Sequence, residues 1–312
     1  MKAIAIGAAA ALLAACATAE EESNAALPSP FGPEDRLGAV NHLSAEKTAA
    51  AAALVQEGRT FALGMVTGPA TPAWGPREYD VTVLQLDDGT GAPLGAAGAV
   101  SNDDLVRTFV GIGSQIDGLG HFGIDHVYYN NVPAADVVSP TGLLQYGTHE
   151  LPPMATRGVL LDMTKHFGVD PVPDGTPFNR AEIDAAAEAA GVTIERGDVV
   201  IFHTGKMEAV ADLPELSPTQ PGLGVEGAQY LSDLGVVAVG ADTFALEVIP
   251  FENPANVFEV HGKLLVENGV YILENMVTAE LAEHGDGEFF FVLGVPRLEG
   301  TVQAIINPVA IR

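Results

Sequence analysis

Three side chains that can bind a metal ion lie close together at Gln115, Asp117 and His121. Gln115 and Asp117 are two residues apart, so on an extended strand both side chains point to the same face. His121 follows after Gly118-Leu-Gly, a stretch that allows the backbone to turn tightly. An amide oxygen, a carboxylate and an imidazole that converge in this way can bind a divalent cation. The alternative is a surface Asp and a loop His with no metal between them.

A second pair of such residues, His261 and Glu274, follows later in the chain. The spacing predicts His261 on a helix and Glu274 at the end of the next strand. Ligands gather at the carboxyl ends of strands in α/β sheets, and a carboxylate there is costly to bury unless it meets a cation. Two clusters with complementary ligands favour one shared metal site over two solvated side chains.

Four further residues are weaker candidates for the same pocket. His203 ends an apolar strand and either borders the pocket or is a hydrogen-bonded strand-end histidine. Asp242 follows another strand. It is either a hydrogen-bond partner of the metal ligands or the N-cap of a helix. Tyr129 and Asn130 either line the substrate side or belong to ordinary loop packing.

The elements that must position these residues follow from the hydrophobic pattern. Apolar runs predict strands, and capping residues followed by amphipathic segments predict helices. Strands that are apolar throughout and separated by helices imply a buried sheet with helices outside. The sequence therefore predicts a single α/β domain with a mixed, partly parallel sheet. The expected strands are Thr60–Val66, Tyr79–Leu86, Arg157–Met163, Asp198–His203, Val236–Gly240, Val270–Leu273 and Glu288–Leu293, and the expected helices are Ser44–Gln56, Asn179–Gly191, Val225–Leu234 and Val260–Glu267.

Composition limits the function classes. The 312 residues include 41 acidic and 14 basic side chains, for a formal net charge of −27. Nucleic-acid binding depends on clustered Lys and Arg, so we do not expect this chain to bind nucleic acid. Hydrophobic residues make up 47% of the chain, which is enough for a folded core. A single cysteine excludes a disulfide framework, and no Gly-x-Ser-x-Gly motif offers a nucleophilic serine.

The N-terminus has the pattern of an export signal. Lys2 precedes an apolar run from Ala3 to Ala15 that is too short to span a bilayer, and Cys16 follows. Leu13–Cys16 resembles the lipobox of bacterial lipoproteins, which implies a lipid anchor on Cys16; an ordinary secretory signal is the alternative. We expect residues 1–15 to be a signal peptide, 16–30 a polar tether and 31–312 the folded domain. Ala17, the residue after the expected anchor, favours attachment to the periplasmic side of the outer membrane over retention at the inner membrane.

Matching stretches that run nearly end to end resemble one enzyme family. The chain is similar to the putative cyclase family of metal-dependent hydrolases, which includes bacterial kynurenine formamidase and isatin hydrolase, and within it to the long-form branch. The stretches that carry the resemblance are Asp35–Asn41, Gly113–His121, Tyr128–Asn130, Arg157–Asp162, His203–Gly205, Gly240–Thr243, His261 and Leu273–Asn275.

The resemblance implies a fold of the swivelling β/β/α type and a particular ligand set. The formamidase motif is His-x-Gly-Thr-His-x-Asp-x-Pro-x-His, with two histidines and the Asp as metal ligands and the last His as acid/base. Here Asp117 and His121 are kept, but Gly111 and Gln115 replace the leading histidines. The resemblance thus implies one Zn²⁺ or Mn²⁺ ion held by Asp117, His261 and Glu274, with Gln115 as a weak ligand or hydrogen-bond donor and His121 as the acid/base.

The expected function is hydrolysis of a C–N bond (amide, formamide or cyclic imide) or a lactone in a small carbonyl substrate, by metal-activated water. The first alternative is a lipoprotein that binds a solute and has no catalytic activity. The second is a member of the family that has lost its metal site. The expected partners are a small-molecule substrate and further copies of the chain, in a dimer or tetramer, as in relatives.

Overall fold

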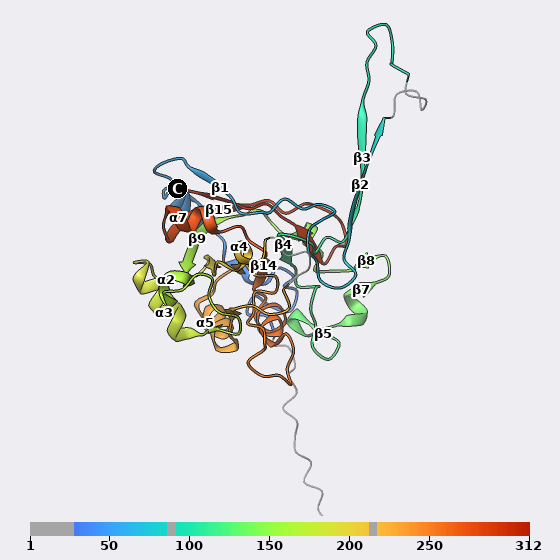
Figure 1. Cartoon of the computed structure of the whole chain (residues 1–312). Helices are drawn as coiled ribbons and strands as arrows, with labels where there is room; N and C mark the ends of the chain where they lie inside the picture. The colour runs from blue at the N-terminus through green and yellow to red at the C-terminus, as the bar shows by residue number, and fades with distance from the viewer. Residues whose placement is uncertain (1–27, 86–91, 212–216) are drawn as a thin grey trace, which may run out of the picture.

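The centre of the molecule is a nine-stranded mixed sheet in a computed structural model that describes residues 28–85, 92–211 and 217–312 (Figure 1). The predicted signal peptide and most of the predicted tether lie outside these residues. The strand order is β1-β17-β15-β9-β11-β13-β14-β4-β16. These strands are β1 (Thr60–Ala62), β4 (Gln115–Asp117), β9 (Met154–Asp162), β11 (Val199–His203), β13 (Ala238–Ala241), β14 (Tyr271–Glu274), β15 (Gly287–Leu293), β16 (Gln303–Ile305) and β17 (Val309–Ile311).

Four neighbouring strands, β9, β11, β13 and β14, run parallel, and the strands on either side of them are antiparallel. Every residue of β11, β13 and β14 is buried. Strands whose residues are all buried fit only where both faces of the sheet are covered. The predicted α/β domain with a mixed, partly parallel sheet is confirmed.

Helices connect the parallel strands and cover the sheet. Helix α3 packs against β9 and α5, while α1 packs against β9 and β15. The start of α3 is fixed as predicted, because the Asn179 N–H donates to Glu182 Oε2 at 3.0 Å. The helices are α1 (Ala45–Ala52), α2 (Met163–Phe167), α3 (Arg180–Ala189), α4 (Lys206–Val210), α5 (Val225–Leu234), α6 (Glu259–His261), which continues as a π-helix over Gly262–Glu267, and α7 (Ala279–His284).

Two predicted elements are shorter than expected. Helix α1 ends at Ala52, because the chain tightens into a turn in which the Leu54 N–H donates to Ala51 O. Strand β1 ends at Ala62 and does not reach Val66. The next residue on its partner strand is Pro308, which has no N–H to continue the ladder.

The last residues of the predicted tether, 28–30, are among the described residues. Ser29 is 8% exposed and is held against the body by hydrogen bonds, one of them accepted from the Tyr129 hydroxyl at 2.9 Å. Its N–H donates to Asn130 Oδ1 at 2.8 Å, and its hydroxyl donates to Asp35 Oδ2 at 2.7 Å. Ser29 is therefore packed on the folded body two residues before the predicted start of the domain, and the division into signal peptide, tether and domain stays a prediction.

A long two-stranded ribbon, which we call the arm, stands away from the body (Figure 1). It consists of β2 (Tyr79–Gln85), β3 (Asn102–Thr108) and the described residues 92–101 between them. The two strands pair antiparallel from Tyr79↔Thr108 to Gln85↔Asn102 as a sheet of their own. The sequence predicts β2 as a strand but not its projection from the body.

Short paired segments complete the structure. They are β5 (Val127–Tyr128), β6 (Val132–Pro133), β7 (Val138–Ser139), β8 (Gly142–Leu143), β10 (Pro177–Phe178) and β12 (Gly222–Leu223). Among the described residues, no helix is long and apolar enough to cross a bilayer.

Candidate metal centre

Three neighbouring strands place polar side chains on one face of the sheet. In the antiparallel register of β4 with β14, Gln115 lies opposite Glu274, and in that of β4 with β16, Gln303 lies opposite Asp117. Residues two apart on β4 share a face, so Asp117 lies beside Gln115 as predicted. The register therefore gathers two carboxylates and two amides at one point.

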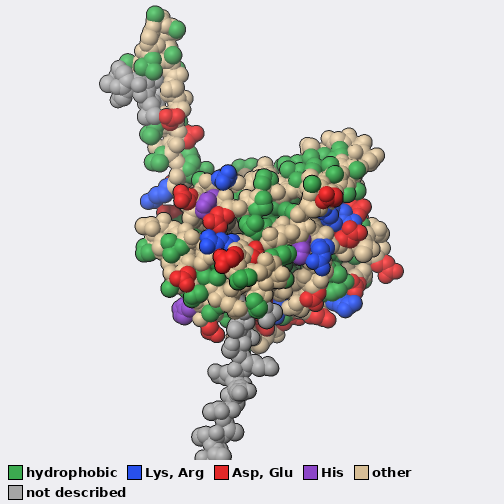
Figure 2. All heavy atoms as spheres, turned by 180° about the vertical axis from the view of Figure 1, so that it is seen from behind, with side chains coloured by type: hydrophobic (Ala, Val, Ile, Leu, Met, Phe, Trp, Pro, Cys, Tyr) green, Lys and Arg blue, Asp and Glu red, His purple; other side chains and the backbone are tan. Residues whose placement is uncertain are grey.

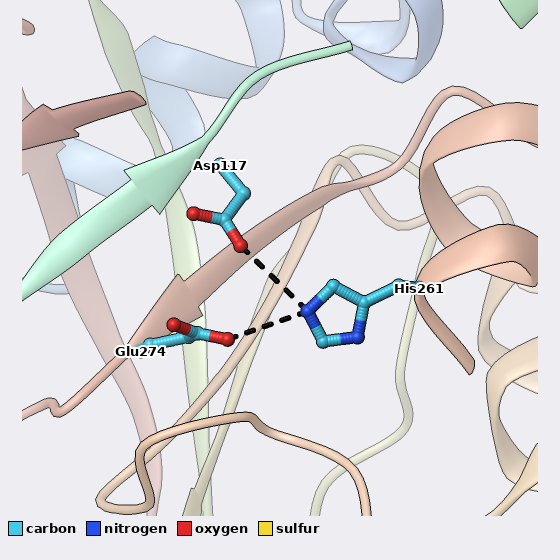
Figure 3. Close-up of side chains that lie close together, drawn as sticks. All are labelled: Asp117, His261 and Glu274. Carbon is cyan, nitrogen blue, oxygen red and sulfur yellow. Dashed lines mark ion pairs between the residues drawn. The ribbon is translucent and has the colours of Figure 1, made fainter. Parts of the chain in front are cut away.

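Helix α6 supplies the imidazole that faces these carboxylates (Figure 3). His261 Nε2 lies 3.4 Å from Glu274 Oε1 and 3.8 Å from Asp117 Oδ2. All three residues are at most 5% exposed. Two ligands of a tetrahedral zinc, each at about 2.1 Å, are about 3.4 Å apart, so the three side chains are spaced as ligands of one cation.

The hydrogen bonds around Asp117 leave one oxygen for such a cation. Its Oδ1 accepts from Gln115 Nε2 at 3.1 Å and from Gln303 Nε2 at 2.7 Å. Its Oδ2 is buried and has no hydrogen-bond partner. A buried carboxylate oxygen without a donor is costly, and a cation bound between Asp117, His261 and Glu274 would satisfy it. The residues present therefore fit a divalent metal ion.

The other nitrogen of His261 is held by a residue that the sequence does not single out. His261 Nδ1 and Glu247 Oε1 form a close hydrogen bond, and Glu247 is buried. This bond orients the ring so that Nε2 points to Asp117 and Glu274. A carboxylate behind a histidine ligand is a common arrangement in metal sites, where it fixes the ring and raises its basicity.

The charges of the cluster shift its pKa values in the metal-free protein. Burial and the nearby Asp117 carboxylate raise the pKa of Glu274 to about 8. Burial opposes the charged form of His261, but hydrogen bonds to Glu247 and Glu274 outweigh it and raise the pKa of the imidazole to about 10. Protons thus offset part of the buried negative charge, and a cation would take their place.

His121 lies at the edge of the cluster. Its Nε2 is 3.8 Å from Asp117 Oδ2, and its side chain is 22% exposed to the pocket above. Burial lowers the pKa of His121, although Asp117 opposes this effect. The ring is therefore neutral at pH 7 and able to accept a proton.

A pocket of about 250 Å³ opens over His121, His261 and Glu274. Aromatic side chains form most of its wall, and Trp74 stacks on Phe244 with ring centroids 5.7 Å apart. Arg77 is the cation of the wall, and its guanidinium donates to Gly111 O. The remaining wall residues are Phe122, Ala245 and Phe258.

Gln303 explains how this chain accommodates Gly111. A Cβ on Gly111 would lie within 2.2–2.7 Å of the Gln303 amide. The Gln303 amide thus fills the space beside Gly111, the position that is His in the formamidase motif. Nothing in the sequence near Gln303 marks this role, and only the missing side chain at Gly111 hints that another residue fills the space.

The remaining predicted site residues lie elsewhere. Tyr129 is fully buried, and its hydroxyl donates to Asp35 Oδ2 at 2.8 Å. Asn130 Nδ2 donates to the carbonyls of Gly32 and Pro33 at 3.1 Å. Both side chains hold the N-terminal segment to the body and are not part of the pocket wall, so their expected place on the substrate side is corrected.

His203 and Asp242 form a separate pair. His203 Nδ1 lies 2.7 Å from Thr278 Oγ1 and 3.4 Å from Asp242 Oδ2. Asp242 accepts the N–H groups of Thr204 and Gly205 just before α4, and the Thr204 hydroxyl as well. Glu208 completes a group that could hold a metal by distance alone. Because the Asp242 carboxylate already accepts these donors, the pair acts as a hydrogen-bonded strand end, one of the alternatives that the sequence leaves open.

Comparison with known proteins identifies the family of the chain. The sequence profile of the family described as "Putative cyclase" matches residues 61–248. No curated protein sequence matches the chain significantly.

Several solved structures have the same fold. A crystal structure described as a novel cyclase is 29% identical, covers 90% of this chain and 98% of its own, and has a TM-score of 0.80. Isatin hydrolase A from Labrenzia aggregata, bound to benzyl benzoate, is 14% identical with a TM-score of 0.60, over 81% of this chain and 93% of its own. A protein described as a potential metal-dependent hydrolase with cyclase activity is 18% identical with a TM-score of 0.51, over 81% of this chain and 98% of its own.

The profile match covers more than half of the chain and includes β4, with Gln115, Asp117 and the following His121. The chain therefore belongs to the Putative cyclase family.

Proposed function

We propose that the protein is a metal-dependent hydrolase that cleaves an amide, formamide, cyclic imide or lactone bond in a small carbonyl compound. The observation that carries the proposal is the convergence of Asp117, His261 and Glu274 beneath a pocket that also contains His121. The solved structures described as an isatin hydrolase and as a potential metal-dependent hydrolase support the same reaction class.

One divalent cation, Zn²⁺ or Mn²⁺, would be held by Asp117, His261 and Glu274. When bound, it supplies the Lewis acidity that activates water and polarises a carbonyl group. The amide of Gln115 donates to both Asp117 and Glu274, the latter at 2.7 Å. Gln115 therefore serves as a hydrogen-bond donor that orients the two carboxylates.

His121 moves the proton in this proposal. Its neutral imidazole accepts a proton from water at the edge of the cluster and returns it to the leaving nitrogen or oxygen. Asp117, 3.8 Å away, stabilises the imidazolium that forms. Arg77 on the pocket wall is placed to pair with the carboxylate that hydrolysis of an amide or lactone produces.

The pocket favours an aromatic substrate. A cavity of about 150 Å³ holds one benzene ring, so a pocket of about 250 Å³ suits one ring fused or joined to a small carbonyl group. Trp74, Phe244 and Phe258 offer aromatic faces and edges for such a ring. A panel of N-formyl anilides, cyclic imides and aryl lactones, assayed with added Mn²⁺ or Zn²⁺, covers this class.

Metal analysis of two variants tests the proposal. His261→Ala should lose bound metal and turnover, whereas His121→Ala should keep the metal and lose turnover. His166→Ala, on α2, is the control and should change neither. Unchanged metal content in folded His261→Ala would rule out the proposed site, and full activity in His121→Ala would rule out the acid/base role. Ligand binding without turnover in the wild type would favour the solute-binding alternative.

We also propose that Cys16 carries a lipid anchor that holds the domain at the periplasmic side of the outer membrane. Cys16 lies outside the described residues, and the lipobox-like Leu13–Cys16 supports this proposal. Labelling of cells with a radioactive fatty acid should mark the wild type but not Cys16→Ser. Equal labelling of the two, or none, would leave an ordinary secretory signal as the explanation.

A further inference from the structure

A second cavity adjoins the pocket over His261. It has a volume of about 270 Å³, and among the described residues Phe244 is the only one that lines both spaces. The ring of Phe244 stacks on Trp74, which lines the first pocket alone. An aromatic wall therefore divides the second cavity from the proposed metal site.

Apolar side chains from two segments form much of the lining of the second cavity. Met65 and Pro72 come from the chain that follows β1, and Met207 and Val210 come from α4. A cavity of about 150 Å³ with an apolar lining stays dry and binds benzene. A space of about 270 Å³ with such a lining thus suits one ring that carries a short side group.

Thr243 adds one unpaired polar atom to this lining. The residue is 2% exposed, and its Oγ1 is buried without a hydrogen-bond partner among the described residues. A buried hydroxyl that makes no hydrogen bond is costly. An acceptor oxygen of a bound organic molecule would satisfy it.

The other neutral polar side chains around the cavity already have partners. Ser217 Oγ, Gln220 Nε2 and Asn275 Nδ2 each donate to a backbone carbonyl, at 3.0, 2.7 and 3.0 Å. A buried water molecule needs about two to four polar partners. A single free hydroxyl among apolar side chains is therefore a better partner for an organic ligand than for water.

The charged side chains of the cavity are paired as well. Lys206 Nζ donates to Asp174 Oδ1 at 2.6 Å, and the Asp242 carboxylate accepts two backbone N–H groups and a hydroxyl just before α4. The chain has a net charge of −27, and Figure 2 shows acidic side chains spread over one face of the body. This charge repels anions, so the ligand that fits the cavity is electrically neutral.

We propose that the second cavity binds a neutral, mainly apolar ring compound with one acceptor oxygen, such as an aryl ketone. The Thr243 hydroxyl donates to that oxygen, and the ring packs on Met65, Met207 and Val210. The site is separate from the proposed substrate site, because Phe244 and Trp74 lie between the two.

NMR of the methionine methyl groups tests the proposal on the purified protein. The chain has six methionines. Met65 and Met207 line the second cavity, and the described residues around the first pocket include no methionine. Met154 and Met163 are fully buried in the core and serve as controls.

Acetophenone is the first probe, since it is one ring with a carbonyl group and has no bond that hydrolysis could cleave. It should shift the ¹³C-methyl signals of Met65 and Met207 and leave those of Met154 and Met163 unchanged. We expect saturation with a dissociation constant of about 1 mM or below, as is usual for a ligand of this size.

Thr243→Val removes the hydroxyl and keeps the shape of the side chain. It should weaken binding of acetophenone about five- to tenfold. Binding of ethylbenzene, which has the same carbon skeleton without the oxygen, should change by less than about twofold, because no hydrogen bond is lost. The melting temperature of the ligand-free variant should not fall, since the hydroxyl has no partner in the folded chain.

Val210→Asp is a second variant that does not depend on the hydroxyl. A carboxylate in the apolar lining should weaken binding of both probes at least about tenfold. Ala209→Asp is the matched control, since Ala209 is the neighbouring residue on α4, is exposed and does not line the cavity. It should change both dissociation constants by less than about twofold.

Benzoate tests the expected neutrality of the ligand. It is similar in size to acetophenone but carries a negative charge, so it should bind at least about tenfold more weakly. Tighter binding of benzoate than of acetophenone would show that Lys206 recognises an anion, and would overturn the proposed ligand class.

Two further results would overturn the proposal. One is the absence of any shift at Met65 and Met207 up to about 10 mM acetophenone. The other is an equal effect of Thr243→Val on acetophenone and ethylbenzene. None of these measurements depends on turnover, so the second site and the proposed hydrolase activity can fail separately.

Discussion

At the scale of single residues, Asp117 is the most constrained side chain of the site. Two amides hold its Oδ1, while its Oδ2 is buried without a donor. The same carboxylate that makes the site suitable for a cation therefore destabilises the metal-free protein. Metal affinity and metal-free stability are opposed at this position.

Asp117→Asn separates the two effects. The Asn oxygen can still accept from Gln115 and Gln303, and its amide nitrogen can donate toward Glu274. We expect the metal-free variant to be more stable than the metal-free wild type by about 1–2 kcal/mol, but to bind Zn²⁺ or Mn²⁺ at least tenfold more weakly. Thermal unfolding with a chelator and with added metal measures both quantities, and a less stable metal-free variant would contradict the argument.

A second prediction concerns Glu247. Its carboxylate holds the His261 ring at Nδ1 and lies on the side of the ring away from the proposed cation. Glu247→Gln should keep all three ligands but loosen the imidazole, and weaken metal binding about 10–100-fold. Competition with a chromogenic chelator measures this affinity. Glu259→Gln, two residues before His261 on α6, is the control and should bind metal as the wild type does.

At the scale of the elements, the sequence predicts those parts of the site that lie on regular structure. The apolar pattern predicts the central strands, and the period of two on β4 places Gln115 beside Asp117. Helix Val225–Leu234 has the predicted bounds because Gly235 ends it in a left-handed conformation. These features depend on neighbours in the sequence, which is why they can be predicted.

The parts that were missed depend on distant segments. Gln303 reaches Asp117 across 186 positions, and Trp74 meets Phe244 across the pocket. Neither contact leaves a local periodicity or motif. Tyr129 and Asn130 were misplaced for the same reason, since their partners, Asp35 and Ser29, lie 94 and 101 residues earlier.

The end of β11 gives a prediction that depends on pH. Burial disfavours the charged form of His203, but Asp242 and Asp162 outweigh it and raise the pKa of the imidazole above its usual value. A histidine with a raised folded-state pKa stabilises the fold fully below its unfolded pKa of about 6.5. This contribution is lost as the pH rises through the folded-state value.

His203→Gln should therefore be destabilised most at pH 6, by about 1–3 kcal/mol, and progressively less as the pH rises. Urea unfolding of both proteins at several values between pH 6 and 9 gives the difference. A difference that grows with pH would show that the charged imidazole does not contribute as described.

At the scale of the whole molecule, the excess of acidic side chains opposes both folding and association. With a net charge of −27, self-repulsion is long-ranged at low salt and is screened within about 10 Å at 0.1 M. Raising NaCl from 0.02 to 0.5 M should therefore raise the melting temperature and tighten association of the chains. Sucrose at equal osmolality is the control for non-ionic effects, and an association that weakens with salt would contradict this explanation.

The base of the arm is also part of the pocket. Arg77, two residues before β2, contributes to the pocket wall and donates to Gly111, which follows β3 by three residues. Any contact that displaces the base of the arm would therefore also displace Arg77, and that contact and substrate binding would be thermodynamically linked. Linkage is reciprocal, so by whatever factor such a contact changes substrate binding, bound substrate would change that contact.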